Sequence, residues 1–111
     1  VETMRRFLGT QGYTEDCIRI MLDDGKSEQP TRANILTAMS WLVEGAASGD
    51  SLFLHYSGHG TQTKDKTGTE KDGLCEAICP VDFSKEGLIL DKELFLTLVA
   101  PLPEDVQMVA V

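Results

Sequence analysis

Residues 17–56 restrict the possible folds of this chain more than any other stretch, because strand and helix signals alternate along them. Residues 17–22 alternate apolar and polar side chains and end at Asp-Asp-Gly, a turn signal. Residues 31–46 repeat apolar side chains at the helical period, with Thr31 as the predicted N-cap. Residues 51–56 form a second apolar run. The order strand, helix, strand predicts parallel strands joined by a right-handed crossover, which is an α/β fold.

The rest of the chain carries shorter signals of the same kinds. Glycine and proline separate the apolar runs, and a polar stretch with no apolar side chain lies near the middle. Both ends fall inside patterned segments, so we expect residues 1–111 to be part of one larger domain. The predicted elements are a helix at 1–11, an exposed loop at 60–73, a hairpin of 77–81 with 88–90, a helix capped by Asp91, and a buried central strand at 106–111.

Charge and cysteine content exclude several classes of function. Eighteen acidic and ten basic residues give a formal net charge of -8, which disfavours binding to nucleic acid or to an anionic membrane and favours cationic ligands. No apolar run approaches membrane length. The three cysteines, an odd number at spacings unlike those of zinc sites, indicate free thiols in a reducing compartment. We therefore expect a soluble cytoplasmic protein.

The candidate for chemistry is His59, which comes directly after the strand at 51–56 in the sequence HYSGHG. Loops that follow parallel strands collect reactive groups, and the glycines around His59 let a substrate approach the backbone. An imidazole there can take a proton from a thiol and return it to a leaving amine, while the Gly60 N–H helps to hold an oxyanion. The alternative is a turn that contains a hydrogen-bonded histidine.

The other histidine and the cysteines favour structural roles. His55 alternates with apolar neighbours inside the strand, so a hydrogen-bonded structural histidine is the preferred interpretation, although a metal pair with His59 is conceivable. Cys17 and Cys79 are predicted to have structural rather than chemical roles, because such thiols are more often buried and inert. Cys75 lies next to the predicted loop, and it is a candidate regulatory thiol because a thiol beside an active site can act as a redox switch.

Several motifs together resemble one family. HYSGHG at 55–60, DGLCEAICPVDF at 72–83, LILDKEL at 88–94 and PLPEDVQMVAV at 101–111 are similar to the metacaspases, caspase-like cysteine peptidases. The resemblance extends over nearly the whole chain. It implies a caspase-like three-layer α/β/α sandwich with a mostly parallel central sheet, of which residues 1–111 are the part that bears the histidine.

The resemblance also implies roles for particular residues. His59 matches the family's catalytic histidine, and Ser57 matches a residue of the pocket for the basic side chain that precedes the cleaved bond. Peptide or protein substrates cleaved after Arg or Lys are therefore expected. The family's nucleophilic cysteine follows the strand that matches 106–111, and a further acidic wall of the pocket precedes Val1. This chain therefore needs the remainder of the catalytic domain for activity.

Calcium is the cofactor that the resemblance implies. Acidic residues after HYSGHG and in the segment matching 90–93 bind it in the family, which makes Asp91 and Glu76 the candidate ligands. Two departures weaken the expected site, because Cys75 stands where an acidic ligand is common and Lys92 where a second aspartate is common.

Two further expectations concern processing and an alternative function. Lys64, Lys66 and Lys71 are candidate self-cleavage sites of a peptidase that cuts after basic residues, although a solvated charge run is the simpler interpretation. The rival to a peptidase is a non-catalytic, truncated caspase-fold module that binds partners.

Overall fold

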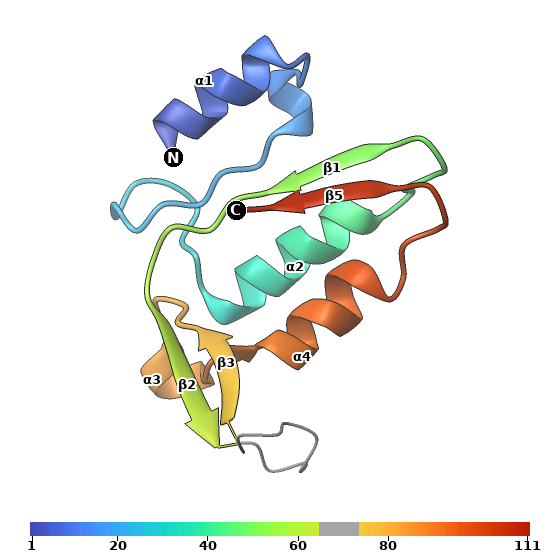
Figure 1. The fold of residues 1–111 in the computed structure, drawn as a ribbon. Coiled ribbons are helices and arrows are strands. Elements are labelled where there is room, and N and C mark those ends of the chain that lie inside the picture. The colour runs from blue at the N-terminus through green and yellow to red at the C-terminus, as the bar shows by residue number, and fades with distance from the viewer. Residues whose placement is uncertain (65–73) are drawn as a thin grey trace.

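The computed structural model describes residues 1–64 and 74–111, and its elements alternate between helix and strand (Figure 1). In chain order they are α1 (Glu2–Thr10), a 3-10 turn (Glu15–Cys17), α2 (Arg32–Val43), β1 (Ser51–Leu54), β2 (Gly60–Lys64), β3 (Leu74–Ile78), α3 (Phe83–Glu86), β4 (Ile89–Leu90), α4 (Asp91–Leu94), a π-helical turn (Phe95–Val99) and β5 (Gln107–Ala110).

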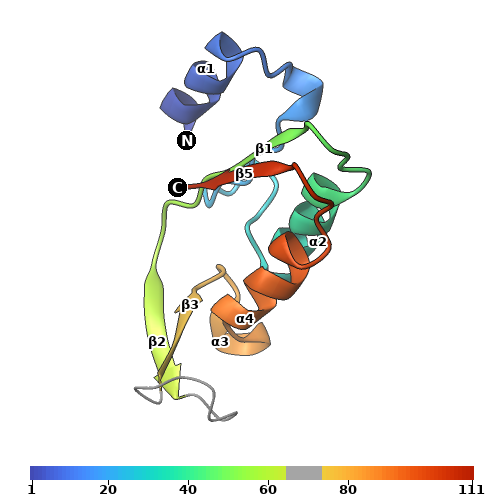
Figure 2. The same cartoon turned by 45° about the vertical axis from the view of Figure 1, so that its right-hand side comes forward.

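The parallel pair of β1 and β5 forms the centre of the fold. The pair runs in register from Ser51 opposite Gln107 to Leu54 opposite Ala110, which confirms the predicted α/β class with parallel strands. Figures 1 and 2 both show this pair between α1 on one side and α2 with α4 on the other. The predicted helical layers on the two faces of the sheet are therefore present.

The core lies between the parallel pair and the helices α2 and α4. Apolar side chains of β1 and β5 pack against a cluster of buried residues from the helices and β4. This burial accounts for the helical period of 31–46, because the repeated apolar side chains must face the sheet to leave water. The buried members of the cluster are Ile35, Met39, Ile89 and Leu98.

A second, antiparallel sheet has the order β2-β3-β4. Ala77 pairs with Leu90 and Ile78 with Ile89, which confirms the predicted pairing of these two runs. The predicted exposed loop at 60–73 is wrong over its first part, because Gly60–Lys64 is strand β2 and pairs with β3. Its threonines suit an exposed edge strand, since strand formation depends on backbone pairing and β-propensity rather than on apolar content.

The strand predicted at 17–22 is also wrong. Residues 15–17 form the 3-10 turn, and the following residues are extended without a ladder to any strand in the described part of the chain. The Leu22 N–H donates instead to the Glu28 carbonyl. Alternation reports which side chains favour burial, but a strand also requires a neighbouring backbone to pair with.

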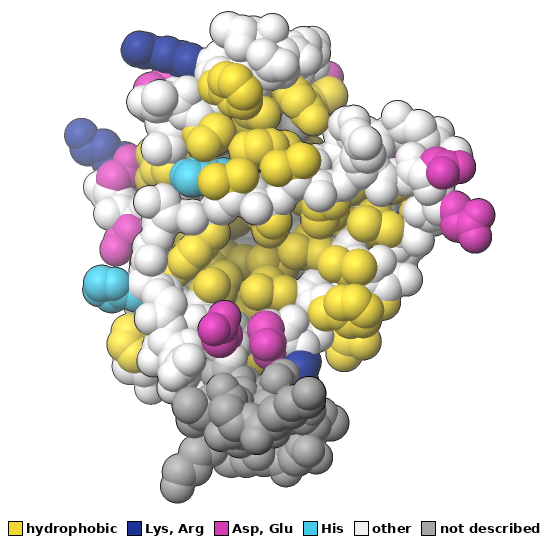
Figure 3. Space-filling view, in the orientation of Figure 1, with side chains coloured by type: hydrophobic (Ala, Val, Ile, Leu, Met, Phe, Trp, Pro, Cys, Tyr) yellow, Lys and Arg dark blue, Asp and Glu magenta, His cyan; other side chains and the backbone are white. Residues whose placement is uncertain are grey.

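Two details at the C-terminal end differ from expectation. The helix α4 begins at Asp91, so Asp91 is its first residue and Leu90 precedes it as the N-cap. The strand β5 forms as predicted but is mostly exposed, with 53% of Val109 accessible to solvent. In the two-stranded sheet, β5 has only β1 beside it, so the burial of a central strand is absent from the described structure. Figure 3 shows hydrophobic side chains gathered across the middle of the molecule, on the side viewed in Figure 1.

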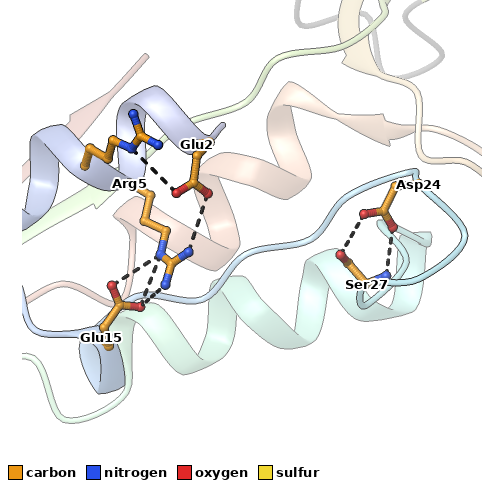
Figure 4. Close-up of polar contacts among 6 residues, drawn as sticks. Glu2, Arg5, Glu15, Asp24 and Ser27 are labelled. Atoms are coloured by element: carbon orange, nitrogen blue, oxygen red, sulfur yellow. Dashed lines mark hydrogen bonds and ion pairs between the residues drawn. The ribbon is translucent and has the colours of Figure 1, made fainter.

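Polar contacts organise the N-terminal third of the chain (Figure 4). The Arg5 guanidinium donates to Glu15 at 2.7 Å and so ties α1 to the 3-10 turn. The Asp24 carboxylate accepts the Ser27 N–H at 2.7 Å, and this bond is the main cause of the lowered pKa of Asp24. The bond from Ser27 to Asp24 confirms the turn predicted at Asp-Asp-Gly. The predicted cap is also confirmed, because Thr31 Oγ1 accepts the Asn34 N–H at 3.2 Å at the start of α2.

Every helix in the described residues is too short or too polar to cross a membrane.

Candidate active site

A cleft of about 490 Å³ lies between the exit of β1, the β2–β3 pair and the start of α4. Tyr56 and Gly58 border it on the β1 side. The strands β2 and β3 contribute one wall and α4 contributes another, so segments far apart in the sequence meet there. The remaining lining residues are Gly60, Thr61, Gln62, Glu76, Ala77, Ile78, Asp91 and Leu94.

His59 lies at the rim of this cleft, between two glycines that line it. The residue is exposed, and its backbone is anchored: the His59 carbonyl accepts the Cys79 N–H at 3.0 Å and the Tyr56 hydroxyl at 2.7 Å. The Tyr56 N–H in turn donates to the Val111 carbonyl at 2.9 Å. His59 therefore comes three residues after Tyr56, the residue that contacts the end of β5.

The backbone N–H of Gly60 points away from β3. Every described peptide bond is trans, so the carbonyl and the N–H of the peptide that joins His59 to Gly60 point in opposite directions. The carbonyl faces β3, because it accepts the Cys79 N–H. The N–H is therefore directed out of the ladder, as an oxyanion donor requires.

Gly58 is required by a close approach. A Cβ atom at this position would lie 2.7 Å from the Tyr56 hydroxyl oxygen and 2.9 Å from the ring carbon that bears it. No side chain fits at these separations without moving the ring. The glycine in the SGHG sequence thus lets the tyrosine ring cross beneath the loop that carries His59.

The structure brings the two predicted calcium ligands to one cleft. Gln62 stands opposite Glu76 across the β2–β3 pair. Ala77, which follows Glu76, pairs with Leu90, which precedes Asp91, and both acidic residues line the cleft. Asp91 Oδ1 is buried and has no hydrogen-bond partner in the described residues. An orphaned buried carboxylate oxygen of this kind suits a cation, because burial without a partner is costly.

Glu76 and Asp91 supply only part of a metal centre. Within residues 1–64 and 74–111, no group of three or more His, Cys, Asp or Glu side chains is placed to hold a metal ion. Calcium takes six to eight oxygen ligands. The described cleft lining, with Glu76, Asp91 and Gln62, therefore supplies only some of the oxygen atoms that calcium requires.

Arg32, the first residue of α2, holds this region in place. Its backbone N–H donates to Asp82 at 2.8 Å, its Nε donates to the Leu88 carbonyl at 3.3 Å, and its guanidinium pairs with Glu93. These contacts fix β4 and α4 on both sides of Asp91. The position of the carboxylate thus depends on a residue that sequence reasoning did not single out.

Three of the other predicted site residues, Ser57, Lys64 and Cys75, lie in described segments of the chain. Ser57 is exposed, between Tyr56 and Gly58. Lys64 is the last residue of β2, and Cys75 lies in β3 opposite Thr63. Lys66 and Lys71 fall outside the described residues.

The structure also places the remaining thiols and the second histidine. Cys17 is exposed, so it lacks the buried surroundings expected of a structural thiol, whereas Cys79 is partly buried, and both are free thiols. The Nδ1 atom of His55 is buried and has no hydrogen-bond partner in the described chain, so the expectation of a fully hydrogen-bonded His55 is wrong at this atom. The contacts that hold the His59 backbone come from Tyr56 and Cys79.

These features define a class before any comparison: an α/β domain with a histidine at the carboxyl end of a parallel strand, beside an acidic cleft. The family model of the metacaspase peptidase C14 domain matches residues 1–111. The chain belongs to this family.

Curated relatives agree with that assignment, and a solved structure shares the fold. Metacaspase-1 of Saccharomyces cerevisiae is 50% identical over 101 residues, covering 89% of this chain and 23% of that protein. Metacaspase-1 of Mycosarcoma maydis is 43% identical over 113 residues, covering 100% and 28%. The chain thus spans about a quarter of the curated relatives it matches. A crystal structure of a Geobacter sulfurreducens protein matches 73% of this chain and 29% of its own, with 31% identity and a TM-score of 0.60.

Proposed function

We propose that the longer protein containing this chain is a cysteine endopeptidase that cleaves after Arg or Lys, with His59 as its general acid and base. The observation that supports this most directly is the His59–Gly60 peptide. It begins three residues after Tyr56, whose N–H donates to the Val111 carbonyl just beyond β5, and its own N–H is directed out of the sheet. Family membership over the whole chain supports the same chemistry.

The proposed reaction needs a thiol from the segment that follows β5 in the longer protein. His59 takes the proton of this thiol, and the thiolate attacks the peptide carbonyl, whose oxygen becomes an anion held by the Gly60 N–H. The tetrahedral intermediate collapses, and the imidazolium gives its proton to the leaving amine. Water, activated by His59, then hydrolyses the thioester, releasing the carboxylic acid and restoring the thiol.

The acidic character of the domain supports the choice of basic substrates. The net charge of -8 attracts cationic side chains to the domain. Ser57 adds a hydroxyl on the β1 side of the loop that carries His59, where it contacts the substrate's basic side chain in this proposal. A cytoplasmic location accords with the free thiols Cys17 and Cys79.

A peptide panel tests the proposed function. Full-length protein is expected to cleave fluorogenic peptides that end in Arg or Lys, to leave matched peptides that end in Asp intact, and to lose activity after alkylation of its thiols. Turnover that survives alkylation would exclude a cysteine peptidase. Absence of turnover on every peptide, with and without calcium, would instead favour a non-catalytic binding module.

We further propose that Asp91 and Glu76 bind calcium, with Gln62 as a neutral oxygen donor. The bound cation would offset the negative charge of the two carboxylates and hold β3 and α4 together at the cleft. Residues of the remaining catalytic domain complete its ligand set in this proposal. The substitution of Cys75 and Lys92 for common acidic positions is expected to make binding weaker than in a site with all carboxylates.

Asp91→Asn is expected to raise the calcium dissociation constant of full-length protein about tenfold, since binding by such sites depends on the number of charged ligands. Isothermal titration calorimetry measures this directly, whatever the activity of the variant. Asp23→Asn, in the exposed turn before α2, is the matched control and should bind calcium like the wild type. Equal affinities for all three proteins would remove Asp91 from the site.

The same proposal gives roles to the exposed parts of the structure. The remainder of the catalytic domain is the partner that covers the open side of β5, where Val109 and Val111 are more than half exposed. Self-cleavage after Lys64, Lys66 or Lys71 would cut the chain between β2 and β3. Mass spectrometry of the protein after incubation with calcium would locate such cuts.

A further inference from the structure

We infer that Tyr56 is a positioning residue that orients the peptide between His59 and Gly60, and thereby both the imidazole and the oxyanion donor. This inference rests on the proposed function. It assigns a role to the one side chain in the HYSGHG sequence that both anchors the loop and lines the cleft.

The contact is short and well placed. The Tyr56 hydroxyl donates to the His59 carbonyl at 2.7 Å, and the Cys79 carbonyl lies 3.4 Å from the same hydroxyl. The Cys79 N–H donates to the His59 carbonyl from the β3 side at 3.0 Å. Two donors therefore fix one carbonyl oxygen, and with it the plane of the whole peptide.

Fixing this peptide affects both catalytic groups at once. The imidazole is attached to the Cα atom on one side of the peptide, and the Gly60 N–H is part of the peptide itself. Hydrogen bonds to a carbonyl also polarise the peptide, which makes its N–H a stronger donor. A rotation of this plane would therefore move the base and misdirect the oxyanion donor together.

Tyr56 also connects this peptide to the end of β5. Its N–H donates to the Val111 carbonyl at 2.9 Å, while its hydroxyl holds His59. One residue thus spans the distance between the segment that leads to the proposed nucleophile and the peptide that carries the base. Gly58 leaves room for the ring, since a Cβ there would lie 2.7 Å from the hydroxyl oxygen.

The hydroxyl is suited to act as a constant donor. Burial raises the pKa of Tyr56 above its ordinary value of 10.0, and so the proton stays on the oxygen throughout the neutral range. The raised pKa also sets the sign of its effect on stability. The contribution is complete below pH 10 and is lost only as the pH rises through the pKa of the folded state.

Tyr56→Phe in the full-length protein tests the inference, because it removes the hydroxyl and keeps the ring. We expect kcat on an Arg-terminated peptide to fall about tenfold, since small displacements of catalytic groups are costly, while KM changes less than about twofold. Tyr13→Phe is the matched control, because the Tyr13 hydroxyl also donates to a backbone carbonyl, that of Ser51, at the far end of β1. Tyr13→Phe should lower the melting temperature by about as much as Tyr56→Phe does, because each variant loses one hydrogen bond to a backbone carbonyl, but it should leave kcat unchanged.

The outcomes separate this inference from the proposed function. A Tyr56→Phe kcat equal to that of the wild type, or an equal loss in Tyr13→Phe, would overturn the positioning role. Gly58→Ala provides a second route, because it displaces the ring without removing the hydroxyl, and unchanged kcat in that variant would also overturn it. Full activity of His59→Ala would instead overturn the proposed function. All assays are run below the lowest melting temperature of the set.

Discussion

His59→Ala in the full-length protein is expected to lower kcat on Arg- and Lys-terminated peptides by at least about a thousandfold, because thiol activation and protonation of the leaving amine both use its imidazole. The variant should fold normally. The His59 side chain is exposed, and the contacts that anchor the loop are made by its backbone carbonyl, which alanine retains. KM should change little, so the loss appears in kcat when initial rates are measured over a range of peptide concentrations.

His55→Gln is the matched control for this result. His55 lies at the carboxyl end of β1, four residues before His59, and is half-buried with Nδ1 away from solvent. Glutamine keeps a polar group of similar reach, so most of the activity should remain. If the two histidine variants lost activity equally, the effect would reflect damage to the β1 exit rather than the loss of a base.

Ile89→Ala should lower the free energy of unfolding by about 3 kcal/mol, because truncation of a buried isoleucine removes apolar contact and leaves a cavity. Ile89 is fully buried, with 0% of its surface exposed, and packs in the cluster shared by α2 and the π-helical turn. It also pairs with Ile78 in the antiparallel sheet, so it connects the hairpin to the main core. Urea denaturation of the full-length protein measures the loss.

Leu96→Ala is the control for the core substitution. Leu96 belongs to the π-helical turn beside the cluster but is 67% exposed, so its truncation should cost less than about 0.5 kcal/mol. Equal destabilisation by the two variants would contradict the assigned core. A large loss in Leu96→Ala alone would show that the exposed face of the π-helical turn is covered by other parts of the longer protein.

Local signals in the sequence predicted several elements correctly. The N-cap at Thr31 and the helical period that follows it define α2, because a cap hydrogen bond and an apolar stripe are properties of neighbouring residues. The sequence pattern also predicted the pairing of β3 with β4 correctly. Both elements are confirmed with boundaries shifted by a few residues, as the fraying of element ends leads one to expect.

Elements whose formation depends on a distant partner were predicted less well. Residues 17–22 alternate like a strand but lack a neighbouring strand in the described structure, whereas the polar segment 60–64 forms β2 because β3 is available to pair with it. The burial expected of 106–111 failed for the same reason, since within residues 1–64 and 74–111 the strand β5 pairs with β1 alone. Side-chain pattern records preference for burial, but only the assembled backbone decides pairing.

The candidate site divides along the same line. Sequence reasoning located His59 and Gly60 at a strand exit and named Glu76 and Asp91 as a pair, and the structure brings those carboxylates to one cleft. It did not single out Tyr56, although a glycine two residues after a tyrosine in HYSGHG is a signal of close packing. It also missed the contacts of Arg32, whose partners lie fifty or more residues away.

The sequence alone determined the α/β class, the helix α2 and the position of a histidine after a half-buried strand, because each follows from the chemistry of residues close together in the chain. Only the tertiary structure decided that the His59 carbonyl meets both Cys79 and Tyr56, that Gly60 directs its N–H outward, and that Asp91 and Glu76 line the same cleft. Those relations depend on how two sheets and a helix pack, and no local pattern encodes distances between segments that meet only on folding.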